Sequence, residues 1–246
     1  AGNTATDNRQ GAFYVLRTLK PLSPPFVDSL ESNPTNWTVL NEELDLETGL
    51  LLQSSTWAWG EPANELAAWG PTGPHLWATN LGNDGNDYAN SSLITPALDL
   101  SGGNRATLHF WHNYDFTPRP EETSILEAGG VFVTTNNGAL WIPFPEAQYG
   151  ESSLGWEEVE LDLTPYLGNV IRIGWAYQLF SLDSVAHPGW VVDDISITVT
   201  NLERGTIIVS NNLAAAEFEL AGPLSQTGQG WSTTIPDAPP GVYIVQ

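Results

Sequence analysis

Short strand-forming runs recur along most of this chain, and no segment keeps the 3.6-residue period of an amphipathic helix. Two of the clearest runs, residues 106–112 and 168–177, lie among Gly, Asn and Asp residues that favour turns. Many short strands with frequent turns are typical of two packed antiparallel sheets, which hide most strand edges. The sequence therefore predicts an all-β fold, a jelly-roll β-sandwich, with a small partial β-sandwich module at the C-terminus.

The first 25 residues differ from the rest of the chain. They hold three of the seven basic residues and a single acid. Residues 11–19 form a strand-like run, and the prolines that follow favour an extended linker. We expect residues 1–25 to be an extra edge strand, the remnant of a preceding domain, or an arm that pairs with another copy of the chain.

A second change of composition falls near residue 200. We expect one jelly-roll domain over residues 26–200 and a partial β module over 201–246. In that module, residues 205–213 and 216–223 have the pattern of a hairpin, and residues 239–245 add a third strand.

Three stretches of the jelly-roll domain are rich in acids, Trp and Pro, and we expect them to be long loops. They are residues 41–74, 113–129 and 143–154.

Acidic side chains dominate the charge of the chain. With 29 acids against seven bases, the net charge is −22, which argues against nucleic acid and anionic membrane surfaces as partners. No run approaches the roughly 18 apolar residues of a membrane-spanning helix. Cys is absent, so a disulfide framework and a thiolate metal site are excluded. Met is also absent, even at position 1, and we expect a chain that begins after removal of a secretion signal.

Two adjacent carboxylates, Asp193 and Asp194, interrupt the otherwise apolar strand at residues 189–199. A buried carboxylate costs several kcal/mol unless it is paired, hydrogen-bonded or bound to a metal. Because the chain has few bases, bound calcium is the simplest partner. The alternative is a hydrogen-bonded Asp pair that caps a loop. Strict alternation puts Asp194 on the same face as Val192 and Asp193 on the other.

The candidate calcium ligands come from parts of the chain that a jelly roll brings together, because its first and last strands are neighbours. They are Asp28, Glu31, Asp87, Asp193 and Asp194. Residues 83–87 resemble half of an EF-hand loop, but Ile94 occupies the place of its bidentate Glu, so an EF-hand is excluded. This segment then supplies one or two ligands or is a plain turn.

Four of the 11 tryptophans crowd a single loop-rich segment. Sugar rings stack on exposed aromatic faces, so these residues are candidates for binding a polysaccharide or cell-surface glycan. The alternative is that they pack in the core. They are Trp57, Trp59, Trp69 and Trp77.

Neither the histidines nor the acids form a recognisable catalytic motif. His109 and His112 are three residues apart in a strand, so their rings face opposite sides and do not form a zinc pair. Glu158, Glu160 and Asp162 share one face and are better explained as a solvated acidic stripe than as a glycosidase pair. We therefore do not expect an enzyme.

The strand at residues 189–197 resembles the closing strand of the MAM-like jelly-roll domains of secreted bacterial proteins, including those appended to immune-inhibitor-A-type metallopeptidases. The resemblance covers about residues 26–199 and implies that Glu31 and an Asp of the final pair hold calcium. Leu30 stands where an aromatic residue usually precedes that Glu. Other matching segments occur in the same order, at residues 26–32, 57–60, 93–100, 108–112, 129–138 and 156–166.

Residues from about 204 to 246 resemble the opening of the small β-sandwich repeats called PEGA domains. Such a repeat normally continues past the strand at residues 239–245, so we expect the module to be incomplete.

Together these features predict a secreted, non-catalytic, calcium-stabilised jelly roll for adhesion or ligand recognition, with carbohydrate as a candidate ligand. Two alternatives stay open. One is a subunit of a surface filament, assembled by strand addition through residues 11–19. The other is the accessory domain of a secreted hydrolase or peptidase.

Overall fold

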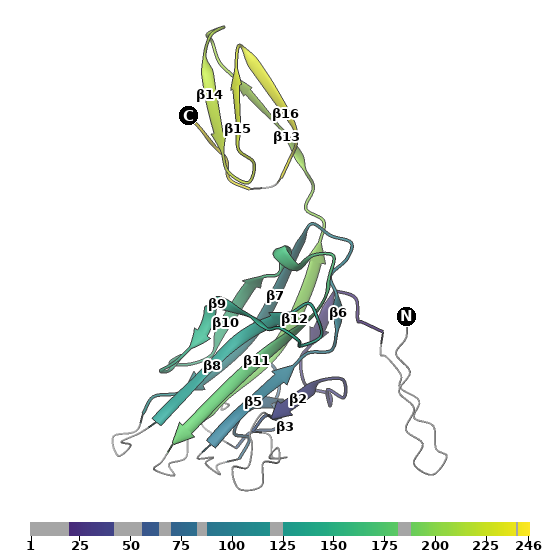
Figure 1. Cartoon of the computed structure of the whole chain (residues 1–246), viewed down its shortest axis with the longest axis vertical. Coiled ribbons are helices and arrows are strands. Elements are labelled where there is room, and N and C mark those ends of the chain that lie inside the picture. Colours follow the sequence, from purple (N-terminus) through teal and green to yellow (C-terminus); the bar gives the residue numbers. More distant parts are fainter. Residues whose placement is uncertain are drawn as a thin grey trace.

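Strands make up most of the part of the chain that the structure describes (Figure 1). This computed structural model describes residues 20–41, 56–63, 70–82, 88–118, 125–181, 188–239 and 241–246. Two six-stranded sheets pack against each other, and every strand pairing in them is antiparallel. The predicted all-β jelly-roll sandwich is confirmed. The described residues include no helix of the length and apolar character that a bilayer crossing requires.

The first sheet has the order β10-β7-β12-β4-β3, with β1 also paired to β12. Its long central strands are β7 and β12. Because β1 pairs with β12, the first and last strands of the sandwich are direct neighbours, as the sequence predicts. The members are β1 (Phe26–Asp28), β3 (Ala58–Gly60), β4 (Leu76–Ala78), β7 (Arg105–Asp115), β10 (Glu157–Asp162) and β12 (Gly189–Thr200).

The second sheet has the order β2-β5-β11-β8-β9, with β6 also paired to β11. A short 3₁₀ helix, η2 (Thr164–Tyr166), leads from β10 of the first sheet towards β11 of the second. The members are β2 (Thr38–Asn41), β5 (Tyr88–Ile94), β6 (Leu98–Asp99), β8 (Ile125–Thr134), β9 (Ile142–Tyr149) and β11 (Val170–Ser181).

One hydrophobic core fills the space between the two sheets. Alternate residues of β11 point into it, among them Ile173, Trp175 and Tyr177, because successive strand side chains face opposite sides. Trp190 of β12 enters the same core from the facing sheet and is fully buried. Burial of these apolar side chains is the main stabilising contribution to the sandwich.

The expected loop over residues 143–154 is wrong for its first half, where β9 forms. Pro143 and Pro145 suggested a loop because proline cannot donate to a sheet ladder. Strand β9 lies at the edge of the second sheet, where a missing donor is tolerated.

After residue 200 the chain forms two small sheets, and the predicted hairpin is wrong. Strand β13 pairs with β16 rather than with β14, while β14 pairs with β15 and β17, so residues 211–216 connect two sheets. Whether residue 200 separates two independent domains stays a prediction. The strands are β13 (Gly205–Ser210), β14 (Glu217–Ala221), β15 (Gln226–Gln229), β16 (Ser232–Ala238) and β17 (Ile244–Val245).

Candidate functional site

A β-bulge in β12 sets the direction of the two adjacent aspartates. The pairing of β12 with β7 shifts register between Asp193 and Ser196, and Asp194 has a positive φ of 48°. Val192 and Ile195 both pack in the core despite being three residues apart. The expectation that Asp194 shares the face of Val192 is therefore wrong, because the bulge breaks the alternation and leaves both Asp residues outside the core cluster.

Asp193 is the least satisfied carboxylate of this region. Its side chain is fully buried, and Oδ2 has no hydrogen-bond partner, while Oδ1 accepts a bond from the backbone N–H of Asp194 at 2.8 Å. Burial raises the pKa of Asp193 to about 7, and the nearby carboxylates of Asp194 and Glu31 add to the rise. The N–H groups of Asp194 and Thr72 oppose the rise in this pKa but do not cancel it. A buried oxygen of this kind calls for a cation or a proton.

The segment from Gly70 to His75, just before β4, lies over the two aspartates. Thr72 donates its hydroxyl to Oδ1 of Asp194 at 2.6 Å. A Cβ placed on Gly70 would meet Oδ2 of Asp193 at 3.5 Å and the carbonyl oxygen of Gly73 at 3.4 Å. Oδ2 of Asp193 and the Gly73 carbonyl oxygen therefore both lie beside Gly70, and the Thr72 hydroxyl contacts the neighbouring Asp194.

Glu31 approaches the same segment from the turn after β1. Its carboxylate accepts a bond from the backbone N–H of His75 at 3.2 Å, and Oε2 lies 3.3 Å from Nδ1 of that ring. Its carboxyl group also covers Gly73 closely enough that a Cβ there would overlap it. Glu31, Asp193 and Asp194 are thus brought to one segment, as the sequence predicts.

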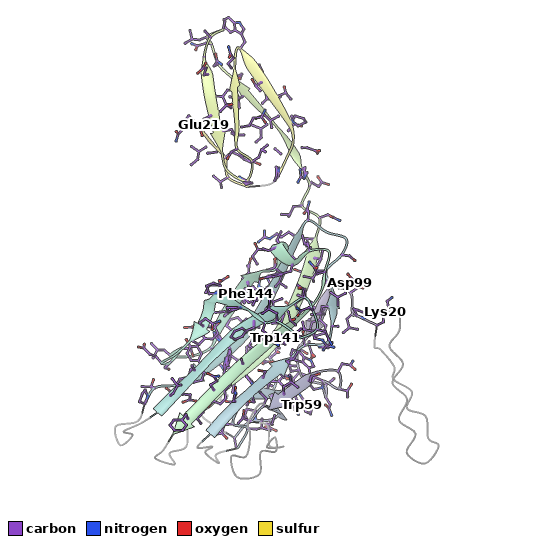
Figure 2. All side chains as sticks on the ribbon, viewed as in Figure 1. Lys20, Trp59, Asp99, Trp141, Phe144 and Glu219 are labelled. Atoms are coloured by element: carbon purple, nitrogen blue, oxygen red, sulfur yellow. The ribbon has the colours of Figure 1, made fainter. Side chains whose placement is uncertain are left out.

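Trp59 of β3, labelled in Figure 2, supports this arrangement through its contacts with Leu30 and His75. Its Nε1 donates to the carbonyl of Leu30 at 2.7 Å, and its ring stacks on His75 with centroids 5.0 Å apart. Leu30 is fully buried with a φ of 60°. The buried Leu30 and the ring of Trp59 together fix the position from which Glu31 reaches the segment.

Asp28 has another role than the ligand expected from the sequence. One of its carboxylate oxygens accepts the backbone N–H of Leu30 at 3.0 Å, and the other accepts Nε1 of Trp37 at 2.9 Å. Both oxygens are used to hold the turn after β1, so Asp28 shapes the approach of Glu31 instead of facing the aspartates.

Asp87, and with it Asp84 and Asn86, lies outside the described residues. Within the described ranges, no three His, Asp or Glu side chains converge closely enough to hold a metal ion by themselves. A cation beside Asp193 would therefore take backbone and hydroxyl oxygens as well, which is the mixed all-oxygen set that calcium accepts and zinc does not prefer.

Two of the four clustered tryptophans are core residues. Trp57 and Trp77 are 3% and 8% exposed, and Trp57 packs against Trp190 with ring centroids 5.6 Å apart. For these two tryptophans the alternative of packing in the core is correct, and their rings present no free face for a sugar. Trp69 lies outside the described residues.

The histidines of β7 face opposite sides, as predicted. His112 is fully buried, and its Nδ1 accepts a hydrogen bond from Nε1 of Trp190 at 3.2 Å. Burial lowers the pKa of His112 to about 4. His109 is on the outer face, with Nδ1 3.9 Å from Oε1 of Glu158 and Nε2 3.8 Å from Oε2 of Glu160. The acidic stripe is exposed to solvent, as expected.

No pattern in the sequence indicates that Thr72 and Gly73 lie at the aspartates. The turn signal in Gly70-Pro71-Thr72-Gly73-Pro74 marks a loop, but it does not say which strand the loop covers. Only the pairing of β4 with β12 brings them together, and that pairing joins residues more than 100 positions apart.

No family model matches the chain. Among curated proteins, Bacillopeptidase F of Bacillus subtilis (strain 168) is 24% identical over 201 residues. The match covers 80% of this chain but 12% of that protein, so the chain spans only a small part of the relative.

Among solved structures, the chain is similar to adhesin and carbohydrate-binding domains. The K1 cleaved adhesin domain of Lys-gingipain from Porphyromonas gingivalis W83 has a TM-score of 0.44 at 20% identity, covering 72% of this chain and 98% of that domain. The CBM22-2 xylan-binding domain of Paenibacillus barcinonensis Xyn10C has a TM-score of 0.38 at 17% identity, with coverages of 71% and 99%. Similarity at this level does not assign a function to this chain.

Proposed function

We propose that this chain is a non-catalytic binding module, a jelly roll stabilised by calcium, that serves adhesion or ligand recognition outside the cell. The observation that carries the calcium site is the buried, unpartnered Oδ2 of Asp193, which lies beside the segment from Gly70 to His75. No Lys or Arg of the described residues forms an ion pair with this group of acids.

The donor set suits calcium by its chemistry. The carboxylates of Asp193 and Asp194, the hydroxyl of Thr72 and the carbonyl of Gly73 are hard oxygen ligands, and Glu31 reaches the same segment from β1. Calcium there would tie β12, β4 and the turn after β1 together, and it would replace the proton that the raised pKa of Asp193 otherwise favours.

The resemblance to MAM-like domains supports this role, because it implies the same Glu and Asp residues. The high acid content and the missing cysteines are compatible with a secreted or surface-attached module. The PEGA-like assignment of the last 43 residues stays a prediction. The filament alternative also stays a prediction, since residues 11–19, which would supply the added strand, lie outside the described part.

A second candidate is the accessory module of a larger peptidase. The observation that favours it is the match to 12% of Bacillopeptidase F over 80% of this chain. This candidate does not conflict with the first, because an accessory module of such a protein would also act by binding.

Calcium titration tests the proposal directly. We expect isothermal titration of chelator-treated protein to show one saturable calcium site. The melting temperature should rise with calcium, because binding to the folded state adds about 2.7 kcal/mol to the free energy of unfolding at a calcium concentration of a hundred times Kd. Asp193→Asn should remove the binding, while Glu158→Gln, which removes an exposed acid of β10, should not. Equal melting temperatures in calcium and in chelator would refute the calcium site.

A further inference from the structure

The outer face of the second sheet has a hollow floor along β11 and β5. The residues that face outward there include the small Gly174 and Ala176 on β11 and Ser92 on β5. Strand pairing sets Ala176 opposite Ser92 on one side and opposite Gly130 of β8 on the other, where the Gln148 side chain covers the glycine. A row of small side chains flanked by larger ones leaves a groove on the surface of a sheet.

Larger residues form the walls of this groove. Trp141, which is labelled in Figure 2, precedes β9. It leans across the floor, since a Cβ on Gly174 would lie 3.1 Å from its ring. Leu40 of β2 stands on the opposite side and is 43% exposed. The hollow has a volume of about 160 Å³. Its lining residues are Leu40, Asn90, Ser92, Ile94, Phe132, Trp141, Gly174, Ala176 and Gln178.

A second hollow of about 170 Å³ continues the first along β11. The two share Asn90 and Gln178, which are direct cross-strand partners. Phe180 and Leu126, 41% and 60% exposed and also paired, border the far end. The distance from Gly174 to Phe180 along the strand is about 20 Å, at roughly 3.3 Å per residue. That length suits several linked units of a chain ligand.

The chemistry of the groove is neutral and amphipathic. None of the residues that line either hollow is ionisable, in a protein of net charge −22. Within the described residues, neither the Asn90 nor the Gln178 amide is hydrogen-bonded to another side chain, and Gln178 is exposed. These two amides offer donors and acceptors at mid-groove, and Trp141 and Phe180 offer apolar ring surface on either side.

We propose that this groove binds a neutral polysaccharide chain, with Trp141 as a stacking surface and Asn90 and Gln178 as hydrogen-bond partners for sugar hydroxyls. The inference rests on the proposed role of the chain as a binding module. A neutral glycan combines apolar ring faces with many uncharged hydroxyls, and the groove presents the complement of both. A basic partner would instead be drawn to the acidic outer face of β10, and an acidic polymer would be repelled by the net charge of the chain.

The test is affinity electrophoresis of the full chain, in calcium, through gels containing xylan, galactan, mannan or mixed-linkage glucan, with polygalacturonate as the acidic counterpart. We expect retardation by at least one neutral polymer and none by polygalacturonate. Titration with the matching hexasaccharide should show a loss of about tenfold or more for Gln178→Ala and for Trp141→Ala. Gln178→Ala changes an exposed side chain and should keep the wild-type melting temperature, so its loss of binding cannot come from unfolding.

Trp231→Ala is the matched control, since this tryptophan is 62% exposed in the small sheets beyond residue 200. It should bind as the wild type does. Retardation that survives both groove variants, or no retardation by any neutral polymer, would overturn the groove assignment. A dimer seen by sedimentation and abolished by Ala176→Trp would also overturn it, because the groove would then be occupied by a second copy of the chain. Calcium binding is measured separately, so failure of the groove leaves the calcium proposal standing or falling on its own result.

Discussion

Asp193 and Asp194 are adjacent in sequence, and both carboxylates lie beside Thr72, a residue more than 100 positions away. The bulge in β12 makes this possible, because it holds Asp194 at a positive φ while Val192 and Ile195 keep their places in the core. The same bulge leaves Oδ2 of Asp193 buried without a partner. Burying this oxygen without a partner costs stability, and the proposed calcium ion would remove that cost.

Asp193→Asn should change the free energy of unfolding in opposite directions with and without calcium. The folded state raises the pKa of this carboxyl from 3.8 to about 7. In chelator, the contribution of Asp193 to the free energy of unfolding is therefore most favourable below pH 4 and is lost as pH rises towards 7. The amide avoids that loss and should be the more stable protein at pH 8, by up to roughly 4 kcal/mol. In saturating calcium the order should reverse. Urea unfolding in both buffers measures this, and a variant less stable in both would show that the carboxylate does not need a cation.

Gly73→Ala should weaken calcium binding as well as folding. The φ of Gly73 is 60°, and a Cβ there would overlap the Glu31 carboxyl, so Glu31 must leave the segment. Gly102→Ala is the matched control, because its φ is 96° with open space around the added atom. We expect both variants to lose about 1 kcal/mol from backbone strain, but only Gly73→Ala to bind calcium more weakly by titration. Equal calcium affinities would remove Glu31 and Gly73 from the site.

Alternation, a local pattern, was sufficient for the fold class, and the jelly-roll assignment brought Glu31 to the two aspartates because it makes the first and last strands neighbours. The prediction failed where details of pairing beyond this general arrangement decide the outcome. The bulge at Asp194 is a tertiary feature of the β7 and β12 ladder, and nothing near Asp194 in the sequence signals it.

The groove on the second sheet was missed for a related reason. Its floor is made of small residues from two strands, none of which is unusual alone, and only the register places Ala176 beside Ser92. The clustered tryptophans are the stronger sequence signal for a sugar-binding surface, but the side chains of Trp57 and Trp77 are buried in the core.

Trp57→Ala should destabilise the sandwich by about 3–5 kcal/mol, because it removes a ring buried against Trp190. Trp231→Ala, at an exposed ring, should change stability by less than about 0.5 kcal/mol. Urea unfolding of both variants in calcium measures the difference. A small effect at Trp57 would mean that its ring is not held in the core and is available to a ligand.

His112 should make the sandwich sensitive to mild acid. Its folded pKa is lowered to about 4 by burial, against 6.5 in the unfolded chain, so the unfolded state takes up the proton first. Its contribution to stability is complete above pH 6.5 and is lost as pH falls towards 4, by up to roughly 3 kcal/mol. The rings around it do not offset this loss, because Tyr114 and Tyr149 have pKa values raised above their ordinary range and stay neutral.

The comparison of His112→Gln with His109→Gln isolates this effect, since both lie on β7 and only His112 is buried. His112→Gln should lower stability at pH 7, because it disturbs the bond from Trp190, yet it should lose less than the wild type between pH 7 and pH 4.5. His109→Gln should follow the wild-type pH profile. Urea unfolding at several pH values, in the Asp193→Asn background to remove the opposing titration at that carboxyl, gives the slopes. If His112→Gln and its parent lose stability in parallel on acidification, the acid sensitivity arises at other groups.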